Sequence, residues 1–343
     1  MKTLVIGPAW IGDMVMAQSL YKKLIAENPQ AGIDVVAPDW SHPLVNRMPE
    51  VRRPIPLPVG HGRMGWRIRR QIGKRLIDEG YAWAIVTPRS WKSALIPFFA
   101  KIPKRTGFLG EFRYGLLTDV RRLDKTLLDQ TVLRYLYLGE PAETLKKPAY
   151  VPYPALSVDT ENQATLAASL NLDLSRPAVC FFPGAAYGPS KQWPADYFQK
   201  LGEMLISDGY QIWIMGSANE KALGDQITDT MGNYGINLCG RTALIDTIDL
   251  MPLAACAVTN DSGLMHVAAA VNLPLQAIYG SSTPAYTPPL STKARVHYLG
   301  IECSPCFKRR CPYGHYNCLY GIFPEQVHQS ILTDQKTGQQ SSS

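Results

Sequence analysis

The chain has 343 residues, which at about 150 residues per domain predicts two domains. With 46% hydrophobic and 18% charged residues and no apolar run near the roughly 18 residues that cross a bilayer, the composition excludes an integral membrane protein and a disulfide-stapled mini-protein. The net charge of +7 is uneven, because residues 1–150 carry 24 Lys and Arg against 13 Asp and Glu, whereas residues 151–343 carry 11 against 15. We therefore expect only the first half to face an anionic partner.

Short apolar or β-branched runs alternate with helical patterns, which is typical of parallel sheets flanked by helices. The pattern restarts after a proline-rich segment near residue 150. It predicts an α/β fold with two doubly wound domains, residues 1–160 and 161–325, then a C-terminal helix and a disordered polar tail within residues 326–343, the tail beginning at Lys336. The predicted strands are residues 3–6, 33–37, 83–87, 178–182, 211–215, 257–260 and 275–279, and the predicted helices include 14–20, 195–207, 220–231 and 264–271.

The first predicted strand runs into the sequence Gly7-Pro8-Ala9-Trp10-Ile11-Gly12-Asp13, just before a helical stretch. At a helix N-terminus a carboxylate caps the helix and interacts favourably with its dipole. In open α/β sheets, however, ligands bind at the carboxyl ends of the strands. Asp13 is therefore equally suited to accept a proton from an attacking hydroxyl as a general base, and the motif alone leaves both roles open.

Eight positive charges lie between residues 52 and 75, in a window without a carboxylate. They form either a solvated surface or a site for an anionic partner. Trp66 is the only aromatic residue of the window, and no recognised DNA- or RNA-binding module is present, so we expect no nucleic acid partner. The eight residues are Arg52, Arg53, Arg63, Arg67, Arg69, Arg70, Lys74 and Arg75.

The loop of residues 183–194 follows another predicted strand. Its small residues let the backbone approach an anion, and Lys191 adds a mobile positive charge suited to a phosphate. After the strand at 211–215, Glu220 is placed to bind a ribose diol, as acidic residues do in dinucleotide-binding domains. Both signals indicate a nucleotide site in the second half.

The segment Asp261–His266 follows a further apolar run. Ser262 and Gly263 begin a helix whose free N–H groups form an anion site. His266, one turn further on, is either a packed core histidine or, with Asp261, part of a ligand pocket.

Four of the seven cysteines, Cys303, Cys306, Cys311 and Cys318, lie within sixteen residues. Because Gly7, Pro8 and Asp13 interrupt the first apolar run, we predict that the chain has no secretory signal. The cysteines are then expected to be reduced thiols rather than disulfides. The four cysteines are then either ligands of a structural zinc or iron ion or free thiols.

The Gly12-Asp13 pair, the loop that ends in Lys191-Gln192-Trp193-Pro194, and the segment Asp261–His266 together resemble the ADP-heptose:lipopolysaccharide heptosyltransferases of glycosyltransferase family 9. The resemblance covers nearly the whole chain in order. It implies a glycosyltransferase B-type fold, in which two Rossmann-like domains face across a cleft, with the acceptor on the first domain and the nucleotide sugar on the second.

For the reaction, the resemblance implies inverting transfer of L-glycero-D-manno-heptose from ADP-heptose to a lipid-linked lipopolysaccharide inner-core acceptor, without a catalytic cofactor. The stretch Gly7–Gln18 looks most like members that add heptose to the first heptose of the core. Addition of the first heptose to the Kdo region is the alternative, and a non-catalytic nucleotide- or nucleic-acid-binding protein is the rival from another class. A cytoplasmic location and peripheral contact with the inner face of the inner membrane are also implied.

The resemblance also assigns residues to roles. Asp13 matches the general base and Lys191 the phosphate-binding lysine. Members that add the first heptose carry hydroxyl residues in the phosphate-binding loop where this chain has Ala185 and Ala186. Backbone N–H groups, Ser190 or Ser262 are the candidates to replace those hydroxyl donors. Donor-binding positions are Glu220, Thr242, Asp261, Ser262, Gly263 and His266, and the expected acceptor-binding residues are Trp10, Arg63, Arg67 and Arg70.

Overall fold

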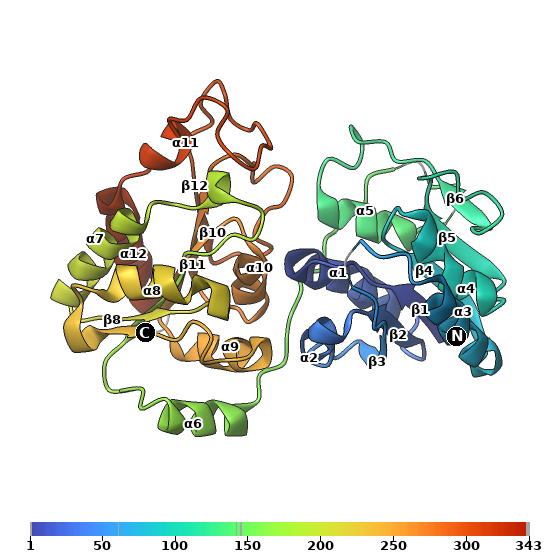
Figure 1. The fold of residues 1–343 in the computed structure, drawn as a ribbon, viewed down its shortest axis with the longest axis horizontal. Coiled ribbons are helices and arrows are strands. Elements are labelled where there is room, and N and C mark those ends of the chain that lie inside the picture. Colours follow the sequence, from blue (N-terminus) through green and yellow to red (C-terminus); the bar gives the residue numbers. More distant parts are fainter. Residues whose placement is uncertain (1, 61, 142, 145, 341–343) are drawn as a thin grey trace. The chain divides into compact units, whose positions relative to one another are not determined.

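The computed structural model describes residues 2–60, 62–141, 143–144 and 146–340, with side chains up to residue 336. The chain divides into two compact units, residues 1–157 and 158–343 (Figure 1). Each unit is built on one six-stranded parallel sheet. Within the described residues, no helix combines the length and apolar character needed to cross a membrane.

The first unit has the strand order β3-β2-β1-β4-β5-β6. Helix α1 packs against α5, and α3 packs against α4. The strands are β1 Lys2–Ile6, β2 Gly32–Ala37, β3 Val51–Pro56, β4 Tyr81–Val86, β5 Lys104–Phe108 and β6 Asp119–Arg121, and the α-helices are α1 Ile11–Glu27, α2 His42–Val45, α3 Trp66–Arg75, α4 Leu95–Phe99 and α5 Thr131–Leu138.

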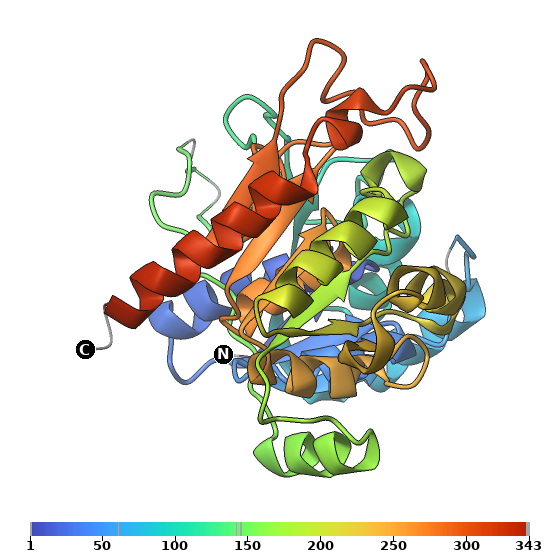
Figure 2. The ribbon, with the colours of Figure 1, turned by 90° about the vertical axis from the view of Figure 1, so that its left-hand side faces the viewer.

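The second unit has the strand order β12-β11-β10-β7-β8-β9. Helix α12 lies beside α7 (Figure 2), and α6 packs against α9. The strands are β7 Ala178–Phe182, β8 Gln211–Ile214, β9 Gly235–Asn237, β10 Cys256–Asn260, β11 Leu275–Tyr279 and β12 Ala294–Tyr298. The α-helices are α6 Thr160–Ser169, α7 Ala195–Ser207, α8 Lys221–Thr228, α9 Leu244–Leu250, α10 Gly263–Ala270, α11 Asn317–Tyr320 and α12 Pro324–Gln340.

Numbered within each unit, both sheets follow the order 3-2-1-4-5-6 of a doubly wound fold. The predicted α/β class with two Rossmann-like domains is thereby confirmed. In this topology the strand order reverses between β1 and β4 and between β7 and β10, and ligands bind outside the carboxyl ends of the strands at such a reversal. The loops that follow these strands are therefore the places to look for a site.

All seven predicted strands are present, with ends shifted by at most two residues. They are the apolar strands, such as β7 and β11, whose residues are buried throughout. The missed strands are shorter, more polar or more exposed; β3, for example, contains Arg52, Arg53 and two prolines, and its Arg52 and Arg53 are exposed. Such strands carry no apolar run for a sequence reading to detect.

The prediction of a disordered tail from Lys336 is wrong for residues 336–340, because α12 continues to Gln340. The helix continues because it is already anchored through the buried Val327 and Ile331, and extending an existing helix requires no new nucleus. Residues 341–343 lie outside the described part of the chain.

Candidate functional site

Asp13 lies in the first turn of α1, directly after β1 and at the strand reversal of the first sheet. Its Oδ1 accepts a hydrogen bond of 2.9 Å from the hydroxyl of Tyr135, a buried residue of α5. The N-cap of α1 is Trp10, whose backbone oxygen accepts from the amide of Met14 and whose side chain makes no cap hydrogen bond. The carboxylate is thus held at the positive end of a helix, with one oxygen oriented by a phenol.

Tyr135 is a site residue that the sequence reading missed. It is 122 positions from Asp13 along the chain and belongs to a helix with no motif of its own. Trp10 is 49% exposed, so its ring is available at the carboxyl edge of the first sheet.

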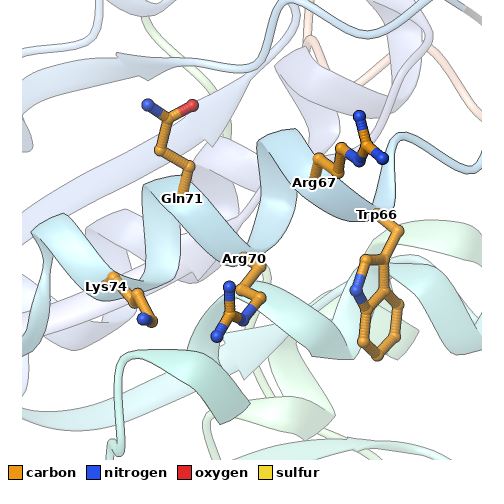
Figure 3. Close-up of a pocket in the computed structure, with 5 residues that line it drawn as sticks. All are labelled: Trp66, Arg67, Arg70, Gln71 and Lys74. Atoms are coloured by element: carbon orange, nitrogen blue, oxygen red, sulfur yellow. The ribbon is translucent and has the colours of Figure 1, made fainter.

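A cationic pocket lies along α3 in the first unit and has a volume of about 370 Å³. The lining residues have helical spacing, and Figure 3 shows Arg70, Lys74 and Trp66 extending from one side of the helix and Arg67 and Gln71 from the other. The Trp66 ring stacks on Trp91 at a centroid distance of 5.8 Å and 13° between planes. The pocket therefore combines a fixed aromatic wall with exposed positive charges.

The predicted basic window does not form one surface. Arg63 is exposed in the loop before α3, where its carbonyl accepts a hydrogen bond of 3.0 Å from the Lys92 amine, and it does not line the pocket. Arg69 is buried and donates to the carbonyl of Met64, and burial lowers the pKa of its guanidinium. Only part of the window is thus available to an anionic partner.

The expectation that the whole basic window is free for an anionic partner is also corrected at Arg52 and Arg53. Both lie on β3 and pair with Asp34 on β2. Arg53 also pairs with Glu79 at 2.7 Å. Burial acts to raise the pKa of Asp34, but hydrogen bonds from Arg52, Tyr81 and Arg53 outweigh it and hold that pKa below its usual value. These two arginines therefore take part in ion pairs that tie β3 to β2 and to Glu79.

In the second unit, Lys191 and Asp261 form an ion pair of 2.5 Å at the strand reversal between β7 and β10. The Ser282 hydroxyl, which follows β11, donates to the same carboxylate oxygen. The Lys191 amine also lies 5.1 Å from the ring centroid of Tyr187. The structure thus joins the two loops that the sequence singled out, and Ser282 is an addition that the sequence reading missed.

Asn260 fixes both ends of the loop that carries Lys191. Its Oδ1 accepts from the amide of Trp193 at 2.9 Å, and its Nδ2 donates to the carbonyl of Pro183 at 2.7 Å. The loop is therefore held at a defined distance from the start of α10.

Ser262 is the N-cap of α10, and Gly263 is its first residue. The buried hydroxyl of Ser262 has no hydrogen-bond partner among the described residues. His266, one turn further on, is buried, and burial lowers its pKa to about 4, so its imidazole is neutral at physiological pH. The helix start thus offers N–H groups and a hydroxyl without a full positive charge.

Glu220 lies against the loop after β7. A Cβ added to Gly184 would be only 1.5 Å from the Oε1 of Glu220, so the close contact between this loop and Glu220 requires glycine at position 184. The Oε2 of Glu220 accepts from the backbone and the hydroxyl of Ser217, at 2.6 and 2.8 Å, in a capping box. Glu220 therefore has a structural role beside the role predicted for it in ribose binding.

Thr242 lies in the loop after β9, and its hydroxyl is 3.3 Å from that of Thr247. The nearby Gly240 donates to the carbonyl of Gly216 at 3.1 Å, which places this loop beside the segment that carries Glu220. The predicted donor-binding residues thus line neighbouring loops at one edge of the second sheet.

Ser190 does not replace the hydroxyl groups missing at Ala185 and Ala186. Its buried hydroxyl donates to the carbonyl of Lys308 and accepts from Ser281 at 3.0 Å. Ser190 is therefore committed to holding a neighbouring segment.

All seven cysteines are free. In the described part of the chain, no three His, Cys, Asp or Glu side chains form a group that could hold a metal ion, and the structural metal stays a prediction beside the alternative of free thiols. Cys318 is buried in the core of the second unit, whereas the Cys311 sulfur accepts backbone N–H bonds. Slight burial acts to raise the Cys311 pKa, but bonds from residues 316, 313, 314 and 315 outweigh it and lower that pKa. Burial, and after it the neighbouring thiols of Cys303, Cys306 and Cys311, raises the pKa of Cys318 to about 11, so the four cysteines lie near one another.

The comparisons with known proteins point to one family. Residues 69–317 match the family model of glycosyltransferase family 9 (heptosyltransferase). The chain is 44% identical over 339 residues to lipopolysaccharide heptosyltransferase 2 of Salmonella typhimurium and to that of Escherichia coli K12, covering 96% of this chain and 97% of each relative. The structure of Escherichia coli ADP-heptose lps heptosyltransferase II matches with a TM-score of 0.88 at 41% identity, over 99% of this chain and 100% of that one.

Proposed function

The chain belongs to glycosyltransferase family 9, the heptosyltransferases, and we propose that it transfers L-glycero-D-manno-heptose from ADP-heptose to the first heptose of the lipopolysaccharide inner core. The observation that carries this choice of acceptor is the 44% identity to relatives named heptosyltransferase 2 over nearly the full length of both chains. Addition of the first heptose to the Kdo region is the alternative, but the chain is 28% identical over only 144 residues to lipopolysaccharide heptosyltransferase 1 of Pseudomonas aeruginosa.

Asp13 is the general base in this proposal. As the acceptor oxygen bonds to the anomeric carbon, its proton passes to the Asp13 carboxylate, and the bond from that carbon to the β-phosphate oxygen of ADP breaks. Attack from the face opposite the departing ADP inverts the anomeric configuration. The hydrogen bond from Tyr135 supports this role because it fixes one carboxylate oxygen and so orients the base.

The second unit binds the nucleotide and stabilises the leaving group. Lys191 and the N–H groups at the start of α10 offset the negative charge that develops on the departing diphosphate. The unpartnered hydroxyl of Ser262 supports a donor role toward the same phosphates, and Asp261 holds the Lys191 amine beside them. Glu220 binds the ribose diol and Thr242 contacts the adenine, while neutral His266 lines the pocket.

The pocket on α3 takes the anionic groups of the acceptor. Guanidinium groups match phosphate and carboxylate oxygens in a two-point geometry, which suits Arg67 and Arg70, and Arg63 adds charge nearby. The exposure of Met64 and Trp66 beside these charges supports peripheral contact with the anionic cytoplasmic face of the inner membrane. The proposal assigns no role to a metal, cofactor or nucleic acid.

Turnover with acceptors of defined core length tests the proposal. Purified protein and ADP-heptose are combined with an inner-core acceptor that carries one heptose or with one that ends at Kdo, and the product mass is measured. We expect one added heptose and one released ADP with the first acceptor only. Transfer to the Kdo-ended acceptor alone would favour the alternative, whereas ADP binding without transfer to either would favour a non-catalytic nucleotide-binding protein.

A further inference from the structure

Residues 303–311, the cysteine-rich segment, lie on residues 183–191, the phosphate loop. The carbonyl of Arg309 accepts from the amide of Ser190 at 3.3 Å, and the carbonyl of Phe307 accepts from the Tyr187 hydroxyl at 2.6 Å. On its other side, the segment bonds to the loop after β11, through Phe307 N to the Ser281 carbonyl at 2.8 Å. It is thus held against two loops at the carboxyl edge of the second sheet.

The approach of the two segments is close. Gly188 has a φ of 146°, and a Cβ added there would be 2.6 Å from the carbonyl oxygen of Arg309. Because backbone carbonyl groups hold the cysteine-rich segment, its basic side chains are not used for this attachment. Lys308, Arg309 and Arg310 are all exposed.

Arg309 and Lys191 approach the same aromatic ring. The guanidinium carbon of Arg309 is 5.7 Å from the ring centroid of Tyr187, and the Lys191 amine is 5.1 Å from it. Neither the phosphate loop nor the cysteine-rich segment contains an Asp or Glu. Both cations therefore lie against the Tyr187 ring, and Lys191 is also paired with Asp261.

The phosphate loop also lacks side-chain donors. Ala185 and Ala186 have no hydroxyl, and the hydroxyl of Ser190 is bonded to the carbonyl of Lys308. A diphosphate carries two to three negative charges, more than Lys191 alone neutralises, and a guanidinium binds phosphate oxygens through two parallel N–H bonds.

We propose that Arg309 is a second cationic ligand of the donor diphosphate, beside Lys191, and replaces the hydroxyl donors that are absent at residues 185 and 186. This role rests on the proposed function, since its ligand is the nucleoside diphosphate portion of the donor. As the glycosidic bond breaks, the electron pair passes to the β-phosphate oxygen, so the guanidinium binds the leaving group more strongly than the intact donor.

Calorimetric titration with ADP and with adenosine tests the proposal in the full-length protein. Arg309→Ala is compared with Arg309→Lys and with the matched control Arg310→Ala, which removes the neighbouring exposed charge. We expect Arg309→Ala to weaken ADP binding on the order of tenfold, Arg309→Lys to recover part of it and Arg310→Ala to leave it unchanged. Adenosine affinity should be the same in all four proteins, because adenosine has no diphosphate.

Equal ADP affinity of Arg309→Ala and wild type would overturn the proposal, and so would equal losses in Arg309→Ala and Arg310→Ala, since those indicate only a general positive field. Wild-type protein that binds no ADP would instead contradict the proposed function itself. Since Arg309 is exposed, its replacement leaves the core intact, and coincident thermal melting curves of the variants verify this.

Discussion

The two units use the same strand order and place opposite kinds of chemistry at its carboxyl edge. In the first unit Arg67, Arg70 and Lys74 of α3 are exposed, and Asp13 is held by a phenol. In the second unit Lys191 and Asp261 form a pair whose side chains are only 17% and 4% exposed. The comparison teaches that the sheet fixes where a site lies, while the loops after the strands decide what that site binds.

The difference in burial also separates two modes of binding an anion. Exposed charges act over several ångströms and are weakened by salt, because the screening length is about 8 Å at physiological ionic strength. A buried pair acts through fixed geometry and is screened much less. Substitutions in the two units should therefore have different sizes and different responses to salt.

The largest effect should come from Asp13→Asn. The amide keeps the shape of the side chain but accepts no proton, so we expect turnover to fall by a factor on the order of 10² or more while ADP affinity is nearly unchanged. Initial rates and calorimetry with ADP measure the two quantities. Near-normal turnover in a folded variant would reduce Asp13 to a residue that stabilises the start of α1.

Lys191→Ala should mainly weaken binding of the donor. Loss of a charge-assisted hydrogen bond to phosphate costs about 1.5 to 3 kcal/mol, or roughly 10- to 100-fold in ADP affinity. The substitution also leaves the buried Asp261 carboxylate without its cation, so thermal stability should fall. Adding Asp261→Asn should restore part of that stability but not the ADP affinity. A variant with weakened acceptor binding and normal ADP binding would invert the assignment of the two units.

Tyr135→Phe removes only the hydroxyl that bonds to Asp13. We expect a loss of about tenfold in kcat with little change in the donor KM, because the phenol acts on the donor only through its hydrogen bond to the base. A double-mutant cycle supplies the control, since Tyr135→Phe should cost nothing further in an Asp13→Asn background. Independent, additive losses would show that Tyr135 acts through packing alone.

The smallest effect should come from neutralising Arg63, Arg67 and Arg70 together. The apparent KM for the acceptor should rise several-fold, and raised salt should do the same to the wild type, with donor affinity barely changed. Arg75→Ala is the matched control, because this exposed residue ends α3 but does not line the pocket. An acceptor stripped of phosphate should show a smaller difference in KM between the triple mutant and the wild type. If the difference in KM is the same as with the intact acceptor, the three arginines do not bind acceptor phosphate.

Much of the site was predictable because its residues follow apolar strands directly. Asp13 follows β1, and Lys191 and Asp261 lie in the segments after β7 and β10, where a parallel sheet brings strand ends together. Tyr135, Ser282 and Arg309 were not predictable in this way. Each contacts its partner, Asp13, Asp261 or Tyr187, from a segment whose local sequence gives no sign of that partner.

By itself, the sequence determined the apolar strands, their alternation with helices, and the family, because burial of both faces requires continuous apolar runs and the motifs lie at strand ends. Tertiary structure alone decided which charges act. It paired Arg52 and Arg53 with Asp34, buried Arg69 and left Arg67 and Arg70 exposed. It also brought the thiol of Cys318 near those of Cys303, Cys306 and Cys311. The physical reason is that charge and ligation depend on distances between side chains, which sequence spacing fixes only within a single element.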